Sequence, residues 1–169
     1  MNVTGSRTIK MAELRDLAVS LGFTDVETYL QSGNLIFNTK LDGQKVAGQL
    51  SSAIAQTFGY PDVAVLVLSE SDLTATVDGN PFVASGADLK KLHVTFASKA
   101  VDSEAFSKLD LGRFQPDQAI LGPKAIYVYC PNGYGTTKLN NAFFEKKLGI
   151  VATTRNWQTV NQLIQKVRG

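Results

Sequence analysis

Apolar residues recur at helical spacing in several stretches of the chain, and these stretches predict amphipathic helices. The first is residues 10–21, where Gly22 follows as the end of the helix. The second lies between the Asp42-Gly43 break and Gly59. The last predicted helix carries its apolar positions at Trp157, Val160, Leu163, Ile164 and Val167. Together the predicted helices cover residues 10–21, 46–58, 70–77, 103–109, 139–148 and 157–168.

Runs rich in β-branched and aromatic residues predict the strands. Residues 26–31 and 34–39 flank Ser32-Gly33, which is typical of a β-hairpin. Residues 62–69 are apolar almost throughout, so we expect a strand buried on both faces. Further strands are predicted at residues 91–98, 118–122, 125–131 and 150–154.

The order of these elements predicts an α+β protein made of two ferredoxin-like subdomains, each a βαββαβ alpha-beta plait. The first is expected at residues 1–80 and the second at 90–169, with a linker at 81–89 and an extra C-terminal helix. The first subdomain has only Asn2-Val3 ahead of its first helix, so its first strand is expected to be missing. Because that strand is central in a plait, its loss leaves unpaired backbone groups, and a dimer is one way to satisfy them.

Composition places the chain among ordinary globular proteins. It has 169 residues, 44% of them hydrophobic and 19% charged, with a net charge of +2 that is too small to indicate a nucleic-acid partner by itself. It has neither an apolar run of membrane-spanning length nor an apolar N-terminal signal segment, and we expect a cytoplasmic protein without membrane contact. The single cysteine, Cys130, cannot form an internal disulfide.

A polar cluster lies where the last predicted strand meets the last helix. The strand is expected to end at Thr153 and Thr154, and Asn156 is a good N-cap for the helix that begins near Trp157. Arg155 then lies beside a helix N-terminus, where exposed amides and hydroxyls suit a phosphate, sulfate or carboxylate. The alternative is structural: Arg155 pairs with an acidic side chain and the threonines satisfy backbone groups.

Three segments resemble a bacterial family called domain of unknown function 1697. They are LRDLAVSLGFTDVETYLQSGNLIFNT, then NPF, then EKKLGIVATTRNWQTV, of which the SGN and TTRNW motifs are the most specific. The resemblance implies two ferredoxin-like subdomains, and it implies no activity because none is established for the family. Relatives begin with an apolar strand, whereas this chain opens at Asn2, which again predicts a missing first strand.

A glycine-rich loop at residues 133–141 is a second candidate for binding an anion. Thr137 is the expected N-cap of the following helix, and Lys138 is expected in its first turn. The loop lacks the spacing of a P-loop, and a capped helix after a flexible turn is the favoured alternative. If Lys138 and Arg155 converge, with Ser32, Asn34 and Asn2 nearby, an anionic ligand would fit between them.

The alternation of side chains along the predicted strands bears on two further groups of residues. Cys130 shares a face with Ile126 and Val128, and we expect His93 to point away from it, which disfavours a catalytic pair. Tyr127 and Tyr129 are then expected beside His93 and Thr95 on an open sheet face, where RNA-binding plaits stack bases. The favoured alternative is that this aromatic face packs on the other subdomain.

The sequence therefore favours a protein that binds an anionic ligand, either a nucleotide, a phosphate or a nucleic acid. A phosphate-handling hydrolase or transferase is one alternative, with Glu145 as a remaining carboxylate, and a structural or interaction protein is another. Metal-binding and redox motifs are missing, so neither a metal nor a cofactor is expected. The expected ligand contacts are Arg155, Asn156, Thr154, Thr153, Lys138, Thr137, Ser32 and Asn34.

Overall fold

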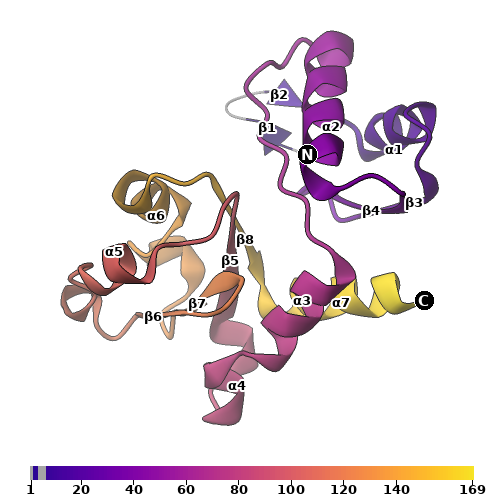
Figure 1. Ribbon diagram of the computed structural model, residues 1–169. Helices are drawn as coiled ribbons and strands as arrows, with labels where there is room; N and C mark the ends of the chain where they lie inside the picture. The colour runs from indigo at the N-terminus through magenta and orange to yellow at the C-terminus, as the bar shows by residue number, and fades with distance from the viewer. Residues whose placement is uncertain (1, 4–6) are drawn as a thin grey trace. The chain divides into compact units, whose positions relative to one another are not determined.

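The computed structural model describes residues 2–3 and 7–169 and divides the chain into two compact units, Met1–Val67 and Leu68–Gly169 (Figure 1). Both units mix helices with antiparallel strands, so the protein is α+β. The division lies ahead of the boundary expected at residues 80–90. The segment from 70 to 84 contacts the sheet of the second unit, as described below.

The first unit contains a β-hairpin and two long helices. The strands β3 (Thr24–Tyr29) and β4 (Asn34–Asn38) pair antiparallel, which confirms the predicted hairpin. The helices are α1 (Met11–Ser20) and α2 (Gly43–Phe58), both as expected from their apolar spacing. Two short strands, β1 (Asn2–Val3) and β2 (Arg7–Thr8), pair with each other.

Capping residues explain where α2 begins and ends. The Asp42 carboxylate accepts a hydrogen bond of 2.9 Å from the Lys45 amide and so caps the first turn. Gly59 follows the last turn with a φ of 71°, the left-handed conformation that glycine adopts without strain. The buried face of α2 places Val46 and Leu50 against Ala18 of α1 and the side chains of the hairpin.

Residues 62–69 are not the buried strand that their apolar sequence predicts. Among the described residues they belong to no sheet, and residues 65–68 are only half-buried. A strand is stabilised by its partners, so strand propensity alone does not create one. The expected strand at 62–69 is therefore wrong.

The second unit has the predicted order of strand, helix, strand, strand, helix, strand. These elements are β5 (Leu92–Ala97), α5 (Ser103–Ser107), β6 (Gln118–Leu121), β7 (Ala125–Tyr129), α6 (Asn141–Leu148) and β8 (Ala152–Asn156). The four strands form one sheet in the order β6-β7-β5-β8, with every neighbouring pair antiparallel. The short 3-10 helices are η1 (Leu89–Lys91), η2 (Gly112–Phe114) and η3 (Tyr134–Thr136).

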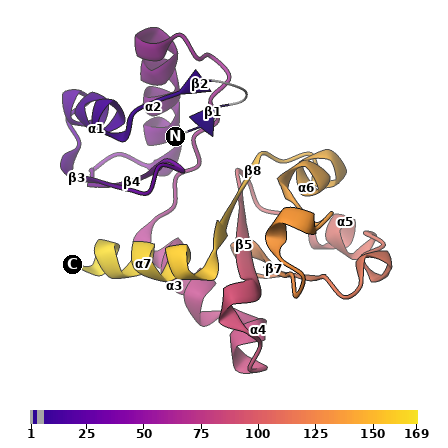
Figure 2. The ribbon, with the colours of Figure 1, turned by 180° about the vertical axis from the view of Figure 1, so that it is seen from behind.

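Helices cover both faces of this sheet (Figure 2). On one face, Phe106 of α5 and Phe144 of α6 pack with Ile126 and Val128 of β7. On the other face lie α3 (Glu70–Asp78), α4 (Pro81–Ala84) and α7 (Trp157–Arg168). The sheet therefore has no open face of the kind that stacks bases in RNA-binding plaits.

Two contacts show how the second face is closed. The Tyr127 hydroxyl donates a hydrogen bond of 2.9 Å to the Thr76 carbonyl in α3. The ring of Phe82 in α4 stacks on Tyr129, with ring centroids 5.7 Å apart. Residues 81–89, expected as a linker, thus contain a helix that packs on the sheet, and the aromatic face packs on α3 and α4.

Candidate functional site

The predicted anion-binding corner lies on β8, which forms one edge of the four-stranded sheet. The Thr154 hydroxyl lies 2.7 Å from the hydroxyl of Thr95, its partner in β5. Because side chains alternate along a strand, Thr154 and Asn156 share one face and Thr153 and Arg155 share the other. The predicted contacts are therefore divided between two faces of the sheet.

Arg155 is half-buried on β8, and its guanidinium is held by its own strand. Its Nη1 donates hydrogen bonds of 2.7 Å to the Thr153 hydroxyl and 3.0 Å to the Thr154 carbonyl. Burial lowers the pKa of Arg155 from its ordinary value, because the charged form loses solvation. Arginine nevertheless remains a cation in proteins, so the site carries a positive charge.

Asn156 is the N-cap of α7, as predicted. Its Oδ1 accepts a hydrogen bond of 2.7 Å from the Thr159 amide. Strand β8 continues to Asn156, two residues beyond the predicted end at Thr154, and α7 begins directly at Trp157. Arg155 is thus a strand residue two positions ahead of the helix.

The loop before α6 differs from its prediction. Asn140 is the N-cap of α6, and its Oδ1 accepts a hydrogen bond of 3.1 Å from the Phe143 amide. Thr137 instead accepts a hydrogen bond of 3.0 Å from the Leu139 amide. Lys138 is exposed and lies ahead of the helix rather than in its first turn. The expected cap at Thr137 is therefore wrong, because a second capping residue lies three positions later.

Lys138 and Arg155 lie in different parts of the second unit. Leu139, which follows Lys138, is buried with Cys130 and Phe144 on the α6 side of the sheet. Arg155 projects from the opposite face of β8, as its alternation with Thr154 requires. Their positions do not support a joint clamp on one ligand.

A polar network that the sequence did not indicate lies between β5, β8 and α6. The Thr154 hydroxyl donates a hydrogen bond of 2.5 Å to Asn141 Oδ1, and it also meets the hydroxyl of Thr95. Tyr134 belongs to the same surroundings, and desolvation raises the pKa of its phenol. In the sequence, the two glycines that flank Tyr134 are the feature that indicates a loop at this position.

Strand register overturns the expected separation of His93 from Cys130. His93 pairs with Val128, and Thr95 pairs with Ile126, so both lie on the same face as Cys130 and opposite to Tyr127. The His93 ring stacks on Tyr134 with centroids 4.5 Å apart, and desolvation lowers the pKa of His93. Its Nδ1 is buried without a hydrogen-bond partner among the residues described.

Cys130 is not an activated nucleophile despite sharing a face with His93. Its side chain is fully buried, and desolvation raises the pKa of the thiol to about 11. A thiol with such a pKa is protonated at neutral pH and reacts slowly. Glu145, the carboxylate considered for an enzyme, accepts a hydrogen bond of 2.8 Å from the Ala152 amide at the start of β8.

Ser32 and Asn34 belong to the first unit and stabilise the hairpin loop. The Asn34 amide donates hydrogen bonds of 2.7 Å to the Tyr29 carbonyl and 3.2 Å to the Ser32 hydroxyl. Gly33 in this loop has a φ of 87°, which accounts for a glycine at that position. These contacts are those of a structural turn.

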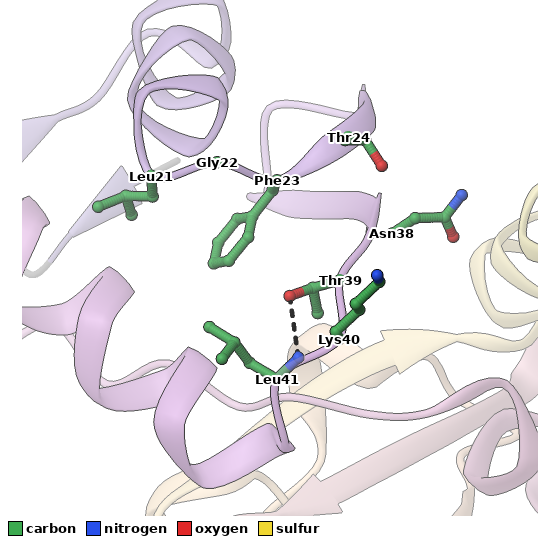
Figure 3. A pocket seen from close by; sticks show the side chains of 8 residues that line it. All are labelled: Leu21, Gly22, Phe23, Thr24, Asn38, Thr39, Lys40 and Leu41. Carbon is green, nitrogen blue, oxygen red and sulfur yellow. Dashed lines mark hydrogen bonds between the residues drawn. The ribbon is translucent and has the colours of Figure 1, made fainter.

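A hollow of about 450 Å³ lies in the first unit between the α1–β3 turn and the β4–α2 turn (Figure 3). The side chains of Leu21, Phe23 and Leu41 converge on it, while Asn38 and Lys40 point to its outer side. The Thr39 hydroxyl accepts a hydrogen bond of 3.2 Å from the Leu41 amide and fixes one wall. The hollow is thus an apolar depression with a polar rim.

Among residues 2–3 and 7–169, no group of three or more His, Cys, Asp or Glu side chains is arranged to hold a metal ion. Within the same ranges, no helix is both long enough and apolar enough to cross a bilayer.

These features define a mixed α+β protein in which a hydrogen bond from Thr154 to Asn141 joins β8 to the first residue of α6. The chain belongs to the family DUF1697, described as a protein of unknown function, whose model matches residues 1–127. The match confirms the resemblance noted from the sequence. It ends ahead of Lys138 and Arg155, so the family match does not extend to either residue.

The fold is also similar to that of a conserved bacterial protein, SP0830 from Streptococcus pneumoniae. The two structures superpose with a TM-score of 0.76 over 99% of this chain and 94% of that chain, at 21% sequence identity. At this identity the likeness concerns the fold alone. A comparison with curated proteins gives no match.

Proposed function

We propose that the second unit binds an anionic ligand at Arg155, and that the recognised group is the phosphate of a nucleotide or a nucleic acid. The observation that carries this proposal is the half-buried guanidinium on an edge strand, two residues ahead of the N-terminus of α7. Arg155 is half-buried rather than fully buried, so part of its side chain remains in contact with solvent.

Electrostatics support an anion at this position. A guanidinium presents planar N–H donors in an arrangement that matches the oxygen atoms of a phosphate. The Thr153 hydroxyl, 2.7 Å from Nη1, orients the guanidinium before any ligand arrives. Such preorganisation reduces the side-chain entropy that binding would otherwise lose.

We further propose that both units are ferredoxin-like plaits. The sheet order β6-β7-β5-β8 and its antiparallel pairing support this for the second unit. In the first unit, the order α1-β3-β4-α2 matches the helix–strand–strand–helix part of the same plan and supports the proposal there.

Isothermal titration calorimetry at low ionic strength tests the anion proposal, with ATP, pyrophosphate and a short single-stranded RNA as probes. We expect saturable binding by at least one probe and weakening with salt, because ion pairing is screened. Arg155→Gln should reduce affinity at least about tenfold, the equivalent of about 1.4 kcal/mol. Arg155→Lys should lose less, since it keeps the charge but not the planar fork.

Arg168→Gln and Lys138→Gln are the matched controls. Arg168 is an exposed arginine of α7 whose Nη2 donates a hydrogen bond of 3.0 Å to Thr74, and Lys138 is an exposed lysine of the loop ahead of α6. Neither change should weaken binding more than twofold, roughly the effect of a distant charge at low ionic strength. Equal losses in Arg155→Gln and the controls would mean that the binding is non-specific and would refute the site.

A further inference from the structure

The two edges of the four-stranded sheet differ in whether their outward backbone groups are occupied. Strands β6 and β8 form these edges, as the order β6-β7-β5-β8 requires (Figure 1). In an antiparallel ladder, every second residue directs both its amide and its carbonyl toward the neighbouring strand, and the residues between them direct both groups outward. An edge strand therefore presents a row of donors and acceptors with which a further strand can pair.

Charged side chains occupy the outward groups of β8. The Ala152 amide donates a hydrogen bond of 2.8 Å to the Glu145 carboxylate. The Thr154 carbonyl accepts a hydrogen bond of 3.0 Å from Nη1 of Arg155. Ala152 and Thr154 are two residues apart, so both direct their backbone groups to the same side of the strand. Charged side chains on an edge strand hinder the addition of another strand, and β8 is thus a protected edge.

The outward groups of β6 are open. The Gly122 amide donates a hydrogen bond of 2.8 Å to the Ala125 carbonyl, so Gly122 and Ile120 face β7, while Ala119 and Leu121 point outward. Among the described residues, no other element hydrogen-bonds the backbone of Ala119 or Leu121. The sequence of β6, QAIL, contains neither a charged residue nor a proline. This edge therefore lacks the features by which edge strands ordinarily avoid pairing.

An isoleucine is exposed beside this open edge. Ile120 pairs with Tyr127, so the two side chains share one face of the sheet. Tyr127 is fully buried and donates its hydrogen bond to α3, whereas 39% of Ile120 is exposed. The helices on this face thus cover Tyr127 and leave Ile120 in contact with solvent. A further strand with an apolar residue opposite Ile120 would remove that surface from water.

We propose that β6 pairs antiparallel with β6 of a second copy of this chain, so that the two four-stranded sheets become continuous. When Ala119 of each copy lies opposite Leu121 of the other, the pairing uses both outward amides and both outward carbonyls of each strand. Ile120 then lies opposite Ile120 of the other copy, on the same face of the sheet. A twofold axis through this pair makes the contact self-complementary, which is the arrangement of most homodimers.

The charges that flank β6 favour the antiparallel arrangement of two copies. Asp117 directly precedes β6, and Lys124, which also forms an ion pair of 3.0 Å with Asp72, follows it. Antiparallel pairing places the beginning of one strand beside the end of the other, so Asp117 of one copy approaches Lys124 of the other. The contact is small, and we expect a transient dimer with a dissociation constant between about 1 µM and about 1 mM.

Sedimentation velocity of the full chain between about 5 µM and about 1 mM measures this association. We expect the sedimentation coefficient to rise with concentration. Ile120→Lys places like charges opposite each other and should weaken the dimer at least about tenfold. Ala119→Pro removes an outward amide hydrogen without affecting the bonds to β7, and it should have the same effect. Val151→Lys is the matched control, because Val151 is 41% exposed directly ahead of the protected edge, and it should leave the association unchanged.

A cysteine at position 120 tests the register independently. Partners in a pair without hydrogen bonds have Cα atoms about 4.5 Å apart, a distance that a disulfide spans. Oxidised glutathione should therefore link two copies of Ile120→Cys but not of Val151→Cys, while burial protects Cys130. A chain that stays monomeric up to about 1 mM would overturn the proposal. So would a dimer that persists in Ile120→Lys and Ala119→Pro, or equal linkage of the two cysteine variants, because the contact would then lie elsewhere.

Discussion

Removal of the Tyr127 hydroxyl should destabilise the second unit by about 2 kcal/mol. The hydroxyl donates a buried hydrogen bond of 2.9 Å to the Thr76 carbonyl near the end of α3. Tyr127→Phe keeps the ring and leaves that carbonyl without its partner. A lost hydrogen bond costs about 1 kcal/mol, and a buried carbonyl left unsatisfied adds about 1 kcal/mol or more. For a unit of about 100 residues this corresponds to a fall in melting temperature of roughly 10 °C.

Urea denaturation followed by the fluorescence of Trp157, the single tryptophan, measures this change in the second unit. The matched control is Tyr129→Phe, which removes a hydroxyl from the same strand while keeping the ring that stacks on Phe82. The control should change the free energy of unfolding by less than about 0.5 kcal/mol. Equal effects of the two substitutions would refute the account of how α3 is fixed to the sheet.

Three further predictions concern the second unit. The pKa of Cys130 is raised to about 11, so unfolding free energy should fall as pH rises from about 9 toward 11, and Cys130→Ala should flatten that loss in urea titrations. Desolvation lowers the pKa of His93, so stability should instead fall as pH drops below about 6.5, and His93→Gln should remove this acid dependence. Asn156→Ala should cost about 1 kcal/mol by removing the cap of α7, whereas Gln158→Ala, at an exposed position of the same helix, should change thermal stability little.

Elements whose signals are local were predicted well from the sequence. The spacing of apolar residues and the glycines that follow them located α1 and α2. The side chain of Asn156 caps a helix that begins at the next residue, so that interaction also depends only on neighbours in the chain. Thr137 was a wrong cap because Asn140, another residue of the capping type, lies nearer to the first apolar turn.

Features that depend on distant partners were not predictable in the same way. The face occupied by His93 follows from its pairing with Val128, and a register different by one residue would have placed it beside Tyr127. Residues 62–69 have the composition of a strand, but among the described residues they pair with no other strand. Thr154 and Arg155 lie on opposite faces of the sheet because β8 continues to Asn156, and its pairing with β5 determines that length.

Nitrogen-15 NMR of the arginine side chains during a titration with ATP tests the anion site most directly, because it observes the guanidinium itself. The account predicts that the Arg155 Nε–Hε resonance shifts and that the shift saturates with ATP. When salt is raised, the resonance should return to its position in the free protein. The resonances of Arg15, which donates a hydrogen bond of 3.2 Å to the Val26 carbonyl, and of exposed Arg168 should stay in place. An Arg155 resonance that does not move while ATP binds elsewhere would contradict the proposed function.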